Sequence, residues 1–437
     1  MSFQAPKGTR DFYPEDMARR QHLIDAWRRV SERHGFEQVD GPIFESLELY
    51  KAKSGEGIVS ELFHFEDRGG RALAIRPEFT PTLARMAAAR ANALPRPIKW
   101  FATSNFCRAE RPQRGRLREF WQWNVDLLGL DDPLADAEVI AVAVGLLQEL
   151  GLTSQQVRVR LSHREAIGRV LVRLGVAEDD LIRAFDLLDQ RDKLPAEEFA
   201  RRGAELGLDE SKVERLNQMC RRRFPAGDVD HLARAIGMDE GLEDLEALDR
   251  RLADFGLTDW CEYDLGIVRG LAYYTGLVFE LHEVSGAERA LAGGGRYDKL
   301  VEQLGGPKLP AVGFGMGDVV LALVLEDKGA APERFGPRPD VFILAADDAS
   351  AERAPAVASA LRGKGVHARF SYKSTRNVGK LMRDAEKAHA RFALVLGSAE
   401  DALKDLATGD QHTWPAPGDA TDPMDAARLE DLVVRVR

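Results

Sequence analysis

A short segment of this 437-residue chain concentrates positive charge. Residues 106–129 read FCRAERPQRGRLREFWQWNVDLLG, and the loop between two strand-like ends carries five arginines: Arg108, Arg111, Arg114, Arg116 and Arg118. Guanidinium groups this close repel one another unless an anion lies among them, and their planar donor pairs suit phosphate. A solvated basic loop is the more common role of an isolated charge run, so the loop alone leaves both interpretations open.

The strand-like segment after the loop, residues 119–128, favours a nucleotide. Side chains alternate between the two faces of a strand. One face therefore carries the apolar residues Trp121, Trp123, Val125 and Leu127. The other carries a ring and three polar groups: Phe120, Gln122, Asn124 and Asp126. A ring that stacks on a base, beside arginines that bind phosphates, suits a nucleotide, although a solvated strand face would also be polar.

The RPEFT segment (76–80) offers groups for a charged ligand. Alternation places Arg76, Glu78 and Thr80 on one face, where the Glu78 carboxylate could hold an ammonium group. The segment also fits a helix start, with Thr80 as N-cap and Pro81 at the first helical position. The two interpretations are compatible.

Other short motifs are less specific when taken singly. RGLAYYTG (269–276) places Arg269 beside Tyr273 and Tyr274, yet buried tyrosines more often belong to a core. AGGGRYD (292–298) permits close backbone approach, although such glycines more often mean a turn. GFGMG (313–317) lacks the GxGxxG spacing of a dinucleotide-binding loop. We find no convincing metal-ligand spacing and no Ser-His-Asp or Cys-His nucleophile.

The elements that must position these residues predict an α+β fold. A helix begins near Pro14, and strand-like runs follow at Ala72–Arg76, Ile98–Cys107 and Glu119–Leu128. Because these strands do not alternate regularly with helices, we predict an antiparallel sheet with flanking helices. Charged, helix-forming sequence then fills residues 166–255 before strands return. This pattern predicts a helical insertion into one domain made of residues 1–165 and 256–328.

A second boundary is predicted near residues 327–340, where Gly, Pro and charge concentrate. Beyond it, strands and helices alternate, which predicts a small α/β domain over residues 338–437. The predicted strands are Val341–Ala345, Val366–Tyr372 and Arg391–Leu396, and the predicted helices are Ala351–Arg362 and Val378–Ala390.

Composition restricts the class of protein. The net charge of −10 argues against a uniformly basic surface but allows a local phosphate-binding patch. Cys107, Cys220 and Cys261 are far apart and form no disulfide framework, which indicates a reducing compartment. The start of the chain lacks the apolar stretch of a signal peptide, and no apolar run approaches membrane-helix length. We therefore expect a soluble, cytoplasmic protein that does not bind membranes.

The order of the motifs is more specific than any one of them. PKGTRDFYPED, DGPIFE, AIRPEFTPTLAR, ERPQRGRLREF, VRGLAYYTGLVFE, AGGGRYDKLVEQLGG and PAVGFGMG follow one another along the chain. From residue 6 to the end, this order resembles the class II histidyl-tRNA synthetases. The C-terminal KDLATGDQ resembles that family's anticodon-binding domain. The resemblance implies ATP-dependent ligation of L-histidine to tRNA(His) through a histidyl-adenylate, with Mg²⁺, by a homodimer that uses Pro42 in its interface motif.

The resemblance also implies roles for individual residues. For ATP, Arg108 would hold the α-phosphate, while the adenine and the phosphate tail would be bound by Glu110, Phe120 and Arg116. For histidine, the α-ammonium and the imidazole would be bound by Glu78, Thr80, Gln122, Asp126, Tyr273 and Tyr274. Arg269 would contact both substrates and act as the catalytic residue together with Arg108. Arg111 and Gln113 would meet the acceptor end of tRNA.

Three positions depart from the family pattern. Val320 stands where an arginine usually binds the γ-phosphate, Asp126 replaces a glutamate, and Ala272 replaces an aspartate. Val320 matters most, because an apolar side chain cannot neutralise a triphosphate. It favours the alternative of a non-catalytic, synthetase-like regulatory subunit of ATP phosphoribosyltransferase. The intact arginine loop, Arg269 and the C-terminal domain favour the enzyme, because those regulators generally lack such a domain. A tRNA-binding scaffold without chemistry would not need Phe120 or Arg116.

Overall fold

The computed structural model describes residues 3–54, 56–191, 193–238, 240, 242–269, 273–415 and 426–436. The chain divides into two compact units, Met1–Arg334 and Phe335–Arg437, and each is described by itself. Ala272, one of the three departures from the family pattern, lies outside the described residues. Among the described residues, no helix combines the length and the apolar character needed to cross a membrane.

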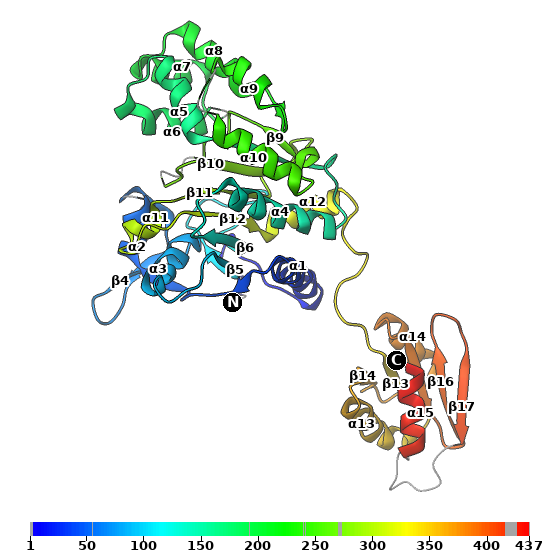
Figure 1. Cartoon of the computed structure of the whole chain (residues 1–437). Coiled ribbons are helices and arrows are strands. Elements are labelled where there is room, and N and C mark those ends of the chain that lie inside the picture. Colours follow the sequence, from blue (N-terminus) through cyan, green and yellow to red (C-terminus); the bar gives the residue numbers. More distant parts are fainter. Residues whose placement is uncertain are drawn as a thin grey trace. The chain divides into compact units, whose positions relative to one another are not determined.

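A nine-stranded sheet forms the centre of the first unit (Figure 1). Most neighbouring strands are antiparallel, and the exceptions are the parallel pairs β1–β5 and β7–β9. This sheet confirms the predicted fold class, and β5 and β6 have the bounds expected from the sequence. In spatial order the strands are β1 (Glu37–Gln38), β5 (Ile98–Cys107), β6 (Glu119–Leu128), β12 (Ala311–Gly317), β11 (Ala292–Arg296), β10 (Leu277–Glu283), β7 (Val157–His163), β9 (Cys261–Tyr263) and β8 (Phe224–Pro225).

Three helices cover one face of this sheet: α1 (Pro14–Arg33), α4 (Pro133–Glu149) and α12 (Asp318–Asp327). The odd-numbered side chains of β6 point toward them, as alternation predicts. Trp123 stacks on Trp27 of α1 with ring centroids 6.2 Å apart, and its indole Nε1–H donates to the Ser31 hydroxyl at 2.9 Å. This buried face fixes β6, so its even-numbered side chains must point to the opposite face.

The opposite face packs against α3 (Thr80–Arg90) and the short α11 (Leu300–Gln303), and it forms a second apolar cluster that includes Phe79, Leu83 and Trp100. A separate three-stranded sheet lies beside α3, in the order β2 (Phe44–Ser46), β4 (Ala72–Ile75), β3 (His64–Glu66), with α2 (Leu47–Ser54) and the 3₁₀ helix η1 (Glu56–Glu61). The predicted N-cap at Thr80 is wrong by one residue. Thr80 is already helical and Phe79 is the N-cap, because the buried Phe79 ring anchors the helix start in this cluster.

Six α-helices separate β7 from β9 and form a distinct helical part of the first unit (green in Figure 1). Their apolar faces pack on one another and continue the core of the sheet, as with Leu171 and Phe185. Two 3₁₀ turns, η2 (Glu178–Asp180) and η3 (Thr258–Trp260), lie in the same stretch. The helices are α5 (Arg164–Arg173), α6 (Leu181–Asp189), α7 (Ala196–Glu205), α8 (Glu210–Arg221), α9 (Val229–Ile236) and α10 (Glu243–Asp254).

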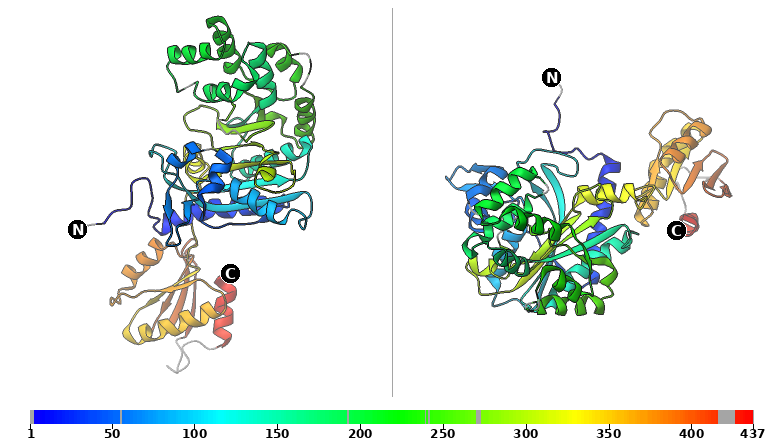
Figure 2. Two further views of the ribbon diagram at one scale, coloured as in Figure 1. Left: turned by 90° about the vertical axis from the view of Figure 1, so that its left-hand side faces the viewer. Right: turned by 90° about the horizontal axis from the view of Figure 1, so that it is seen from above.

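The second unit is a five-stranded α/β structure (Figure 2). β13 pairs in parallel with both of its neighbours, whereas β16 and β17 add an antiparallel hairpin that the sequence pattern did not indicate. In spatial order the strands are β14 (Ala368–Phe370), β13 (Val341–Ala345), β15 (Phe392–Leu396), β16 (Glu400–Asp405) and β17 (Gln411–Pro415). The helices are α13 (Asp348–Gly363), α14 (Val378–Lys387) and α15 (Ala426–Val436).

Candidate active site

The face of the large sheet that carries the even-numbered side chains of β6 lines a cavity of about 80 Å³. Its walls come from β6, β11 and β12, from the segment before α3, and from the segment that joins β9 to β10. Eight residues to which the family resemblance gives roles meet here: Glu78, Thr80, Arg108, Gln122, Asp126, Arg269, Tyr273 and Tyr274. Side chains nearly 200 residues apart in sequence therefore converge on one small polar space.

The β6 side chains in the cavity are held by hydrogen bonds. The Gln122 amide Nε2 donates to the Asn124 side-chain oxygen at 2.9 Å. Asp126 is 1% exposed, and the Tyr297 hydroxyl donates to its Oδ1 at 2.6 Å. Asn124 and Tyr297 also line the cavity. Tyr297 was not identified from the sequence, because the GGRYD motif shows a tyrosine but not the strand register that brings it to Asp126.

Glycines of β11 and β12 make room for the site side chains. A Cβ built on Gly293 would lie 1.5 Å from Arg269 Nη1, and one built on Gly313 would lie 2.0 Å from Asp126 Oδ1. On Gly315 it would lie 2.5 Å from Gln122 Nε2. Of the two interpretations of AGGGRYD, the structure agrees with close approach and not with a turn, since its glycines lie in strand β11. Because β11 and β12 have only glycines at these positions, the polar side chains of the site can approach the two backbones closely.

This arrangement predicts the effect of Gly293→Ala. The new methyl group would clash with the guanidinium of Arg269 and not with backbone atoms. We therefore expect the Arg269 side chain to move while the fold persists. The rate of the reaction proposed below should fall about tenfold, because misplacing a catalytic group by about 1 Å can cost up to 10²-fold. The melting temperature should stay close to that of the wild type.

Gly294→Ala is the matched control. A Cβ at position 294 would lie 2.3 Å from the Gly313 carbonyl oxygen, so this variant should lose stability instead. Calorimetric unfolding and pyrophosphate-exchange kinetics on both variants distinguish the two effects. Full activity in Gly293→Ala would show that the position of Arg269 is not critical.

Arg269 is held in place by an ion pair with Glu280 of strand β10. Its Nη1 lies 2.9 Å from Glu280 Oε1, and the other oxygen of Glu280 lies 2.8 Å from His282 Nε2. Arg269 has a φ of +45°, a conformation that residues other than glycine rarely adopt. Such strained backbone is found most often at functional sites. Glu280 was not singled out from the sequence, where it is one acidic residue of an ordinary strand.

Arg108 remains positively charged, and the phenols of Tyr273 and Tyr274 remain neutral. The Arg108 Nε–H donates to the Pro77 carbonyl at 3.1 Å, and its guanidinium lies 5.0 Å from the centre of the Phe120 ring. Burial lowers the pKa of Arg108, but guanidinium groups remain charged in proteins. Burial raises the pKa of both Tyr273 and Tyr274. The site therefore offers neutral phenols beside permanent positive charges.

Arg114, Arg116 and Arg118 of the loop do not converge on one cavity, because each of them binds a group of the protein. Arg116 pairs with Glu110, and Arg114 pairs with Glu288. Arg118 donates to the Glu110 backbone carbonyl at 3.1 Å. Carboxylates of the protein, Glu110 and Glu288, therefore provide negative charge among these arginines.

The other predicted contacts lie around the cavity and not in its wall. Arg111 and Gln113 are exposed on the loop. Glu110, Arg116 and Phe120 are not among the residues that line the cavity. Arg76, expected beside Glu78, is instead 4% exposed, and its Nη1 lies 2.7 Å from Asp40 Oδ1. The alternation argument fails for Arg76 because residues 76–79 are not a strand.

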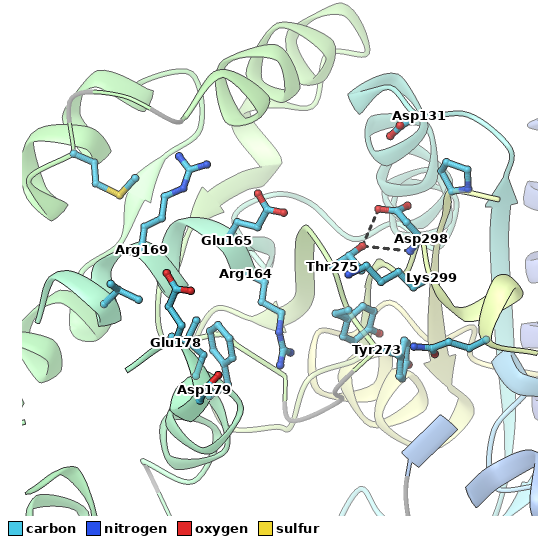
Figure 3. Close-up of a pocket in the computed structure, with 18 of the residues that line it drawn as sticks. Asp131, Arg164, Glu165, Arg169, Glu178, Asp179, Tyr273, Thr275, Asp298 and Lys299 are labelled. Carbon is cyan, nitrogen blue, oxygen red and sulfur yellow. Dashed lines mark hydrogen bonds between the residues drawn. The ribbon is translucent and has the colours of Figure 1, made fainter. Parts of the chain in front are cut away.

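A larger pocket of about 1300 Å³ opens next to the cavity and shares Tyr273 and Tyr274 with it. One wall comes from α5 and α6 of the helical part, with Arg164 and Arg169, and the opposite wall comes from the sheet side, with Asp298 and Lys299 (Figure 3). The Thr275 hydroxyl donates to Asp298 Oδ2 at 2.8 Å and ties this second wall together. The cavity and the larger pocket therefore adjoin at Tyr273 and Tyr274.

The fold and the site together are those of a class II aminoacyl-tRNA synthetase. A family model of histidyl-tRNA synthetases matches residues 8–318, and one of anticodon-binding domains matches residues 340–415. A histidine–tRNA ligase of Opitutus terrae is 41% identical over 95% of this chain and 96% of its own. The chain belongs to the histidyl-tRNA synthetase family.

Solved structures agree on the fold. A histidyl-tRNA synthetase from Nostoc sp. PCC 7120 superposes with a TM-score of 0.80, at 24% identity over 100% of this chain and 99% of its own. A protein from Bacillus halodurans C, described as an ATP phosphoribosyltransferase regulatory subunit/histidyl-tRNA synthetase, superposes with a TM-score of 0.72, at 23% identity over 91% and 99%. The fold alone therefore does not separate enzyme from regulator.

Proposed function

We propose that this protein ligates L-histidine to tRNA(His) in two steps, using ATP to form histidyl-adenylate and releasing pyrophosphate and then AMP. The observation that supports this most strongly is the shared cavity of Arg108, Arg269, Asp126 and Tyr274. Two permanent cations beside a carboxylate and a phenol match an anionic phosphate next to an imidazole. A regulator has no need to bring phosphate-binding arginines to its amino-acid pocket.

The first step is governed by electrostatics. The carboxylate of histidine is ionised at neutral pH, so its attack on the α-phosphorus needs no general base. The reaction requires in-line positioning and stabilisation of the charge that develops on the phosphate oxygens. Arg108 and Arg269 would flank the α-phosphate, while Glu78, Thr80 and Gln122 would hold the α-ammonium group of histidine. In the second step, a terminal ribose hydroxyl of tRNA attacks the adenylate.

Recognition of histidine would rest on paired polar groups. Asp126 would accept a hydrogen bond from one imidazole nitrogen, and the neutral Tyr274 hydroxyl would pair with the other, with Tyr273 packed on Tyr274 at a ring-centroid distance of 4.6 Å. Although Asp126 is one methylene shorter than the usual glutamate, its hydrogen bond from Tyr297 fixes its position. A site built on such pairs rejects analogues that lack them by roughly 10⁴–10⁵.

Mg²⁺ would enter with ATP as part of the substrate. The described residues contain no group of three or more His, Cys, Asp or Glu side chains placed to hold a metal ion. Substrate-borne Mg²⁺ needs only one or two protein carboxylates in addition to phosphate oxygens, and Glu110 and Glu280 lie beside the arginines of the site. The ion would neutralise charge on the departing pyrophosphate. Glu110 and Phe120 would bind adenine, and Arg116 the phosphate tail.

The tRNA would approach from the open side of the site. Arg111 and Gln113 are exposed there on the loop, where they would meet the acceptor end. The helical part would clamp the acceptor arm across the larger pocket, whose walls carry Arg164, Arg169 and Lys299. The second unit would read the anticodon.

We further propose that two copies of the chain form a homodimer in the cytoplasm. Pro42 belongs to the segment that resembles the family's interface motif, and its neighbours Ile43 and Phe44 are 45% and 50% exposed. Phe65 of β3, on the other side of β4, is 44% exposed and packs edge-on against Phe44. Adjacent exposed apolar side chains of this size are typical of a contact surface.

A non-catalytic regulator remains the second candidate, and Val320 is the observation that favours it. Val320 is 7% exposed and packs in the apolar core on α12, a helix without any lysine or arginine. A regulator would bind histidine without activating it. The match of residues 340–415 to an anticodon-binding domain favours the enzyme.

Amino-acid-dependent exchange of pyrophosphate into ATP, run with all twenty amino acids, distinguishes the two candidates. We expect only histidine to support exchange, because only imidazole satisfies both Asp126 and Tyr274. A folded sample that exchanges with no amino acid but binds histidine would identify the regulator. Exchange with another amino acid would disprove the assigned specificity.

A further inference from the structure

Because Val320 replaces the family's usual arginine, the outer phosphates of ATP lack their usual partner. The triphosphate carries most of its charge beyond the α-phosphate, whereas Arg108 and Arg269 are already assigned to the α-phosphate. The helix that would supply the cation, α12, carries Val320 and no basic residue. If the protein activates histidine, another positive charge must reach the same place.

One arginine from a different part of the chain lies beside Val320. A Cβ built on Gly115, at the tip of the arginine loop, would lie 3.2 Å from Val320 Cγ2 and 3.6 Å from Arg289 Cδ. Both side chains thus lie within 4 Å of the same point beside Gly115, although residue 289 belongs to the β10–β11 connection and residue 320 to α12. Arg289 therefore brings a basic side chain near position 320, beside the same glycine of the arginine loop.

Arg289 is also free to bind an anion. It makes no hydrogen bond and no ion pair with any residue that the structure describes. Partial burial lowers its pKa, the positive charge of Arg116 lowers it further, and the carboxylates of Glu110 and Glu280 raise it. Its guanidinium is therefore close enough to Arg116, proposed to bind the phosphate tail, and to Glu280, the partner of Arg269, to feel the charge of both.

The connection that carries Arg289 is fixed to the ATP loop. The buried carboxylate of Glu288 pairs with Arg114, across 174 residues of sequence. At the start of the connection, Lys328 Nζ lies 2.6 Å from Glu283 Oε1. These ion pairs hold the backbone of Arg289 in place while leaving its guanidinium available.

We propose that Arg289 binds the β- and γ-phosphates of ATP in place of the arginine that is usual at position 320. The inference rests on the proposed function and deepens it by naming the residue that completes the triphosphate site. Glu288 acts as a positioning residue through Arg114. The apolar residue at 320 then no longer argues for a regulator.

Binding of MgATP measured by calorimetry, together with the KM for ATP in pyrophosphate exchange, tests this proposal. Arg289→Ala should raise the Kd and KM for ATP by at least about tenfold, since a hydrogen bond to a charged group is lost, with the KM for histidine within about twofold. Arg289→Lys should recover part of the affinity. A stable histidyl-adenylate analogue, which lacks β- and γ-phosphates, should bind Arg289→Ala as tightly as the wild type.

Arg250→Ala is the matched control, because Arg250 is likewise exposed and makes no hydrogen bond or ion pair within the described chain. Unchanged ATP affinity in Arg289→Ala, or an equal loss for the adenylate analogue, would refute the role. If the wild type binds ATP but does not exchange with histidine, the proposed function fails, and the ATP-binding measurements still decide the role of Arg289.

Discussion

Arg269→Ala is expected to lower the rate of histidyl-adenylate formation by about 10²–10³, the usual cost of removing one preorganised donor to a developing negative charge. Arg269 lines the cavity and is aimed into it by Glu280, at 2.9 Å. Glu280 keeps His282 as a partner in the variant, at 2.8 Å, so the site should stay folded. Single-turnover measurement of adenylate formation at saturating ATP and histidine reports this step directly.

Histidine affinity separates a catalytic role of Arg269 from a structural one. Glu78, Gln122, Asp126 and Tyr274 remain in place in the variant, so the Kd for histidine should change by no more than a few-fold. The exposed Arg250→Ala again serves as the control for loss of an arginine. Turnover equal to that of the wild type would remove Arg269 from its assigned role, and a collapsed histidine affinity would make it a residue of the amino-acid pocket.

Asp126→Ala should raise the Kd for histidine about 10²-fold or more. Truncating one partner of a buried, charged hydrogen bond costs about 2–5 kcal/mol, and about 1.4 kcal/mol is a factor of ten. Tyr274→Phe removes only a hydroxyl, so we expect about a tenfold loss. Equilibrium binding of histidine without ATP measures both effects.

Tyr297→Phe provides the comparison for Asp126→Ala. It removes the 2.6 Å hydrogen bond to Asp126 but leaves the carboxylate that would meet imidazole. Its effect on histidine affinity should therefore be much smaller than that of Asp126→Ala. If Asp126→Ala and Tyr274→Phe both bind histidine as well as the wild type, the imidazole is recognised elsewhere and the specificity assignment is wrong.

The main strands of the sheet could be predicted from sequence because their signals are local. The run from Ile98 to Cys107 and the run from Glu119 to Leu128 have the observed bounds of β5 and β6. Period-two alternation depends only on neighbouring residues, so the cavity face of β6 follows from the apolar face. The same reasoning failed at Arg76, where the chain is not a strand, and it did not indicate the β16–β17 hairpin.

The choice of site residues came from the order of the motifs, and the structure brings eight of them to one cavity. Their roles in binding and catalysis remain predictions. Sequence patterns did not indicate Tyr297, Glu280 or the glycines of β11 and β12 as parts of the site. Each of these matters only through a partner that strand pairing brings close, and register is a property of two strands together.

The sequence alone was enough to predict which side chains share a face of a helix or strand, and it shows which family motifs occur in order. Only the tertiary structure decided which distant residues come close: Gly293 to Arg269, Tyr297 to Asp126, and both Arg289 and Val320 to Gly115. The physical reason is that periodicity acts over a few residues, whereas these contacts depend on strand order and on the course of loops. Position 320 looks like a missing charge in the sequence, and in the folded chain Arg289 from another segment approaches the same glycine, Gly115.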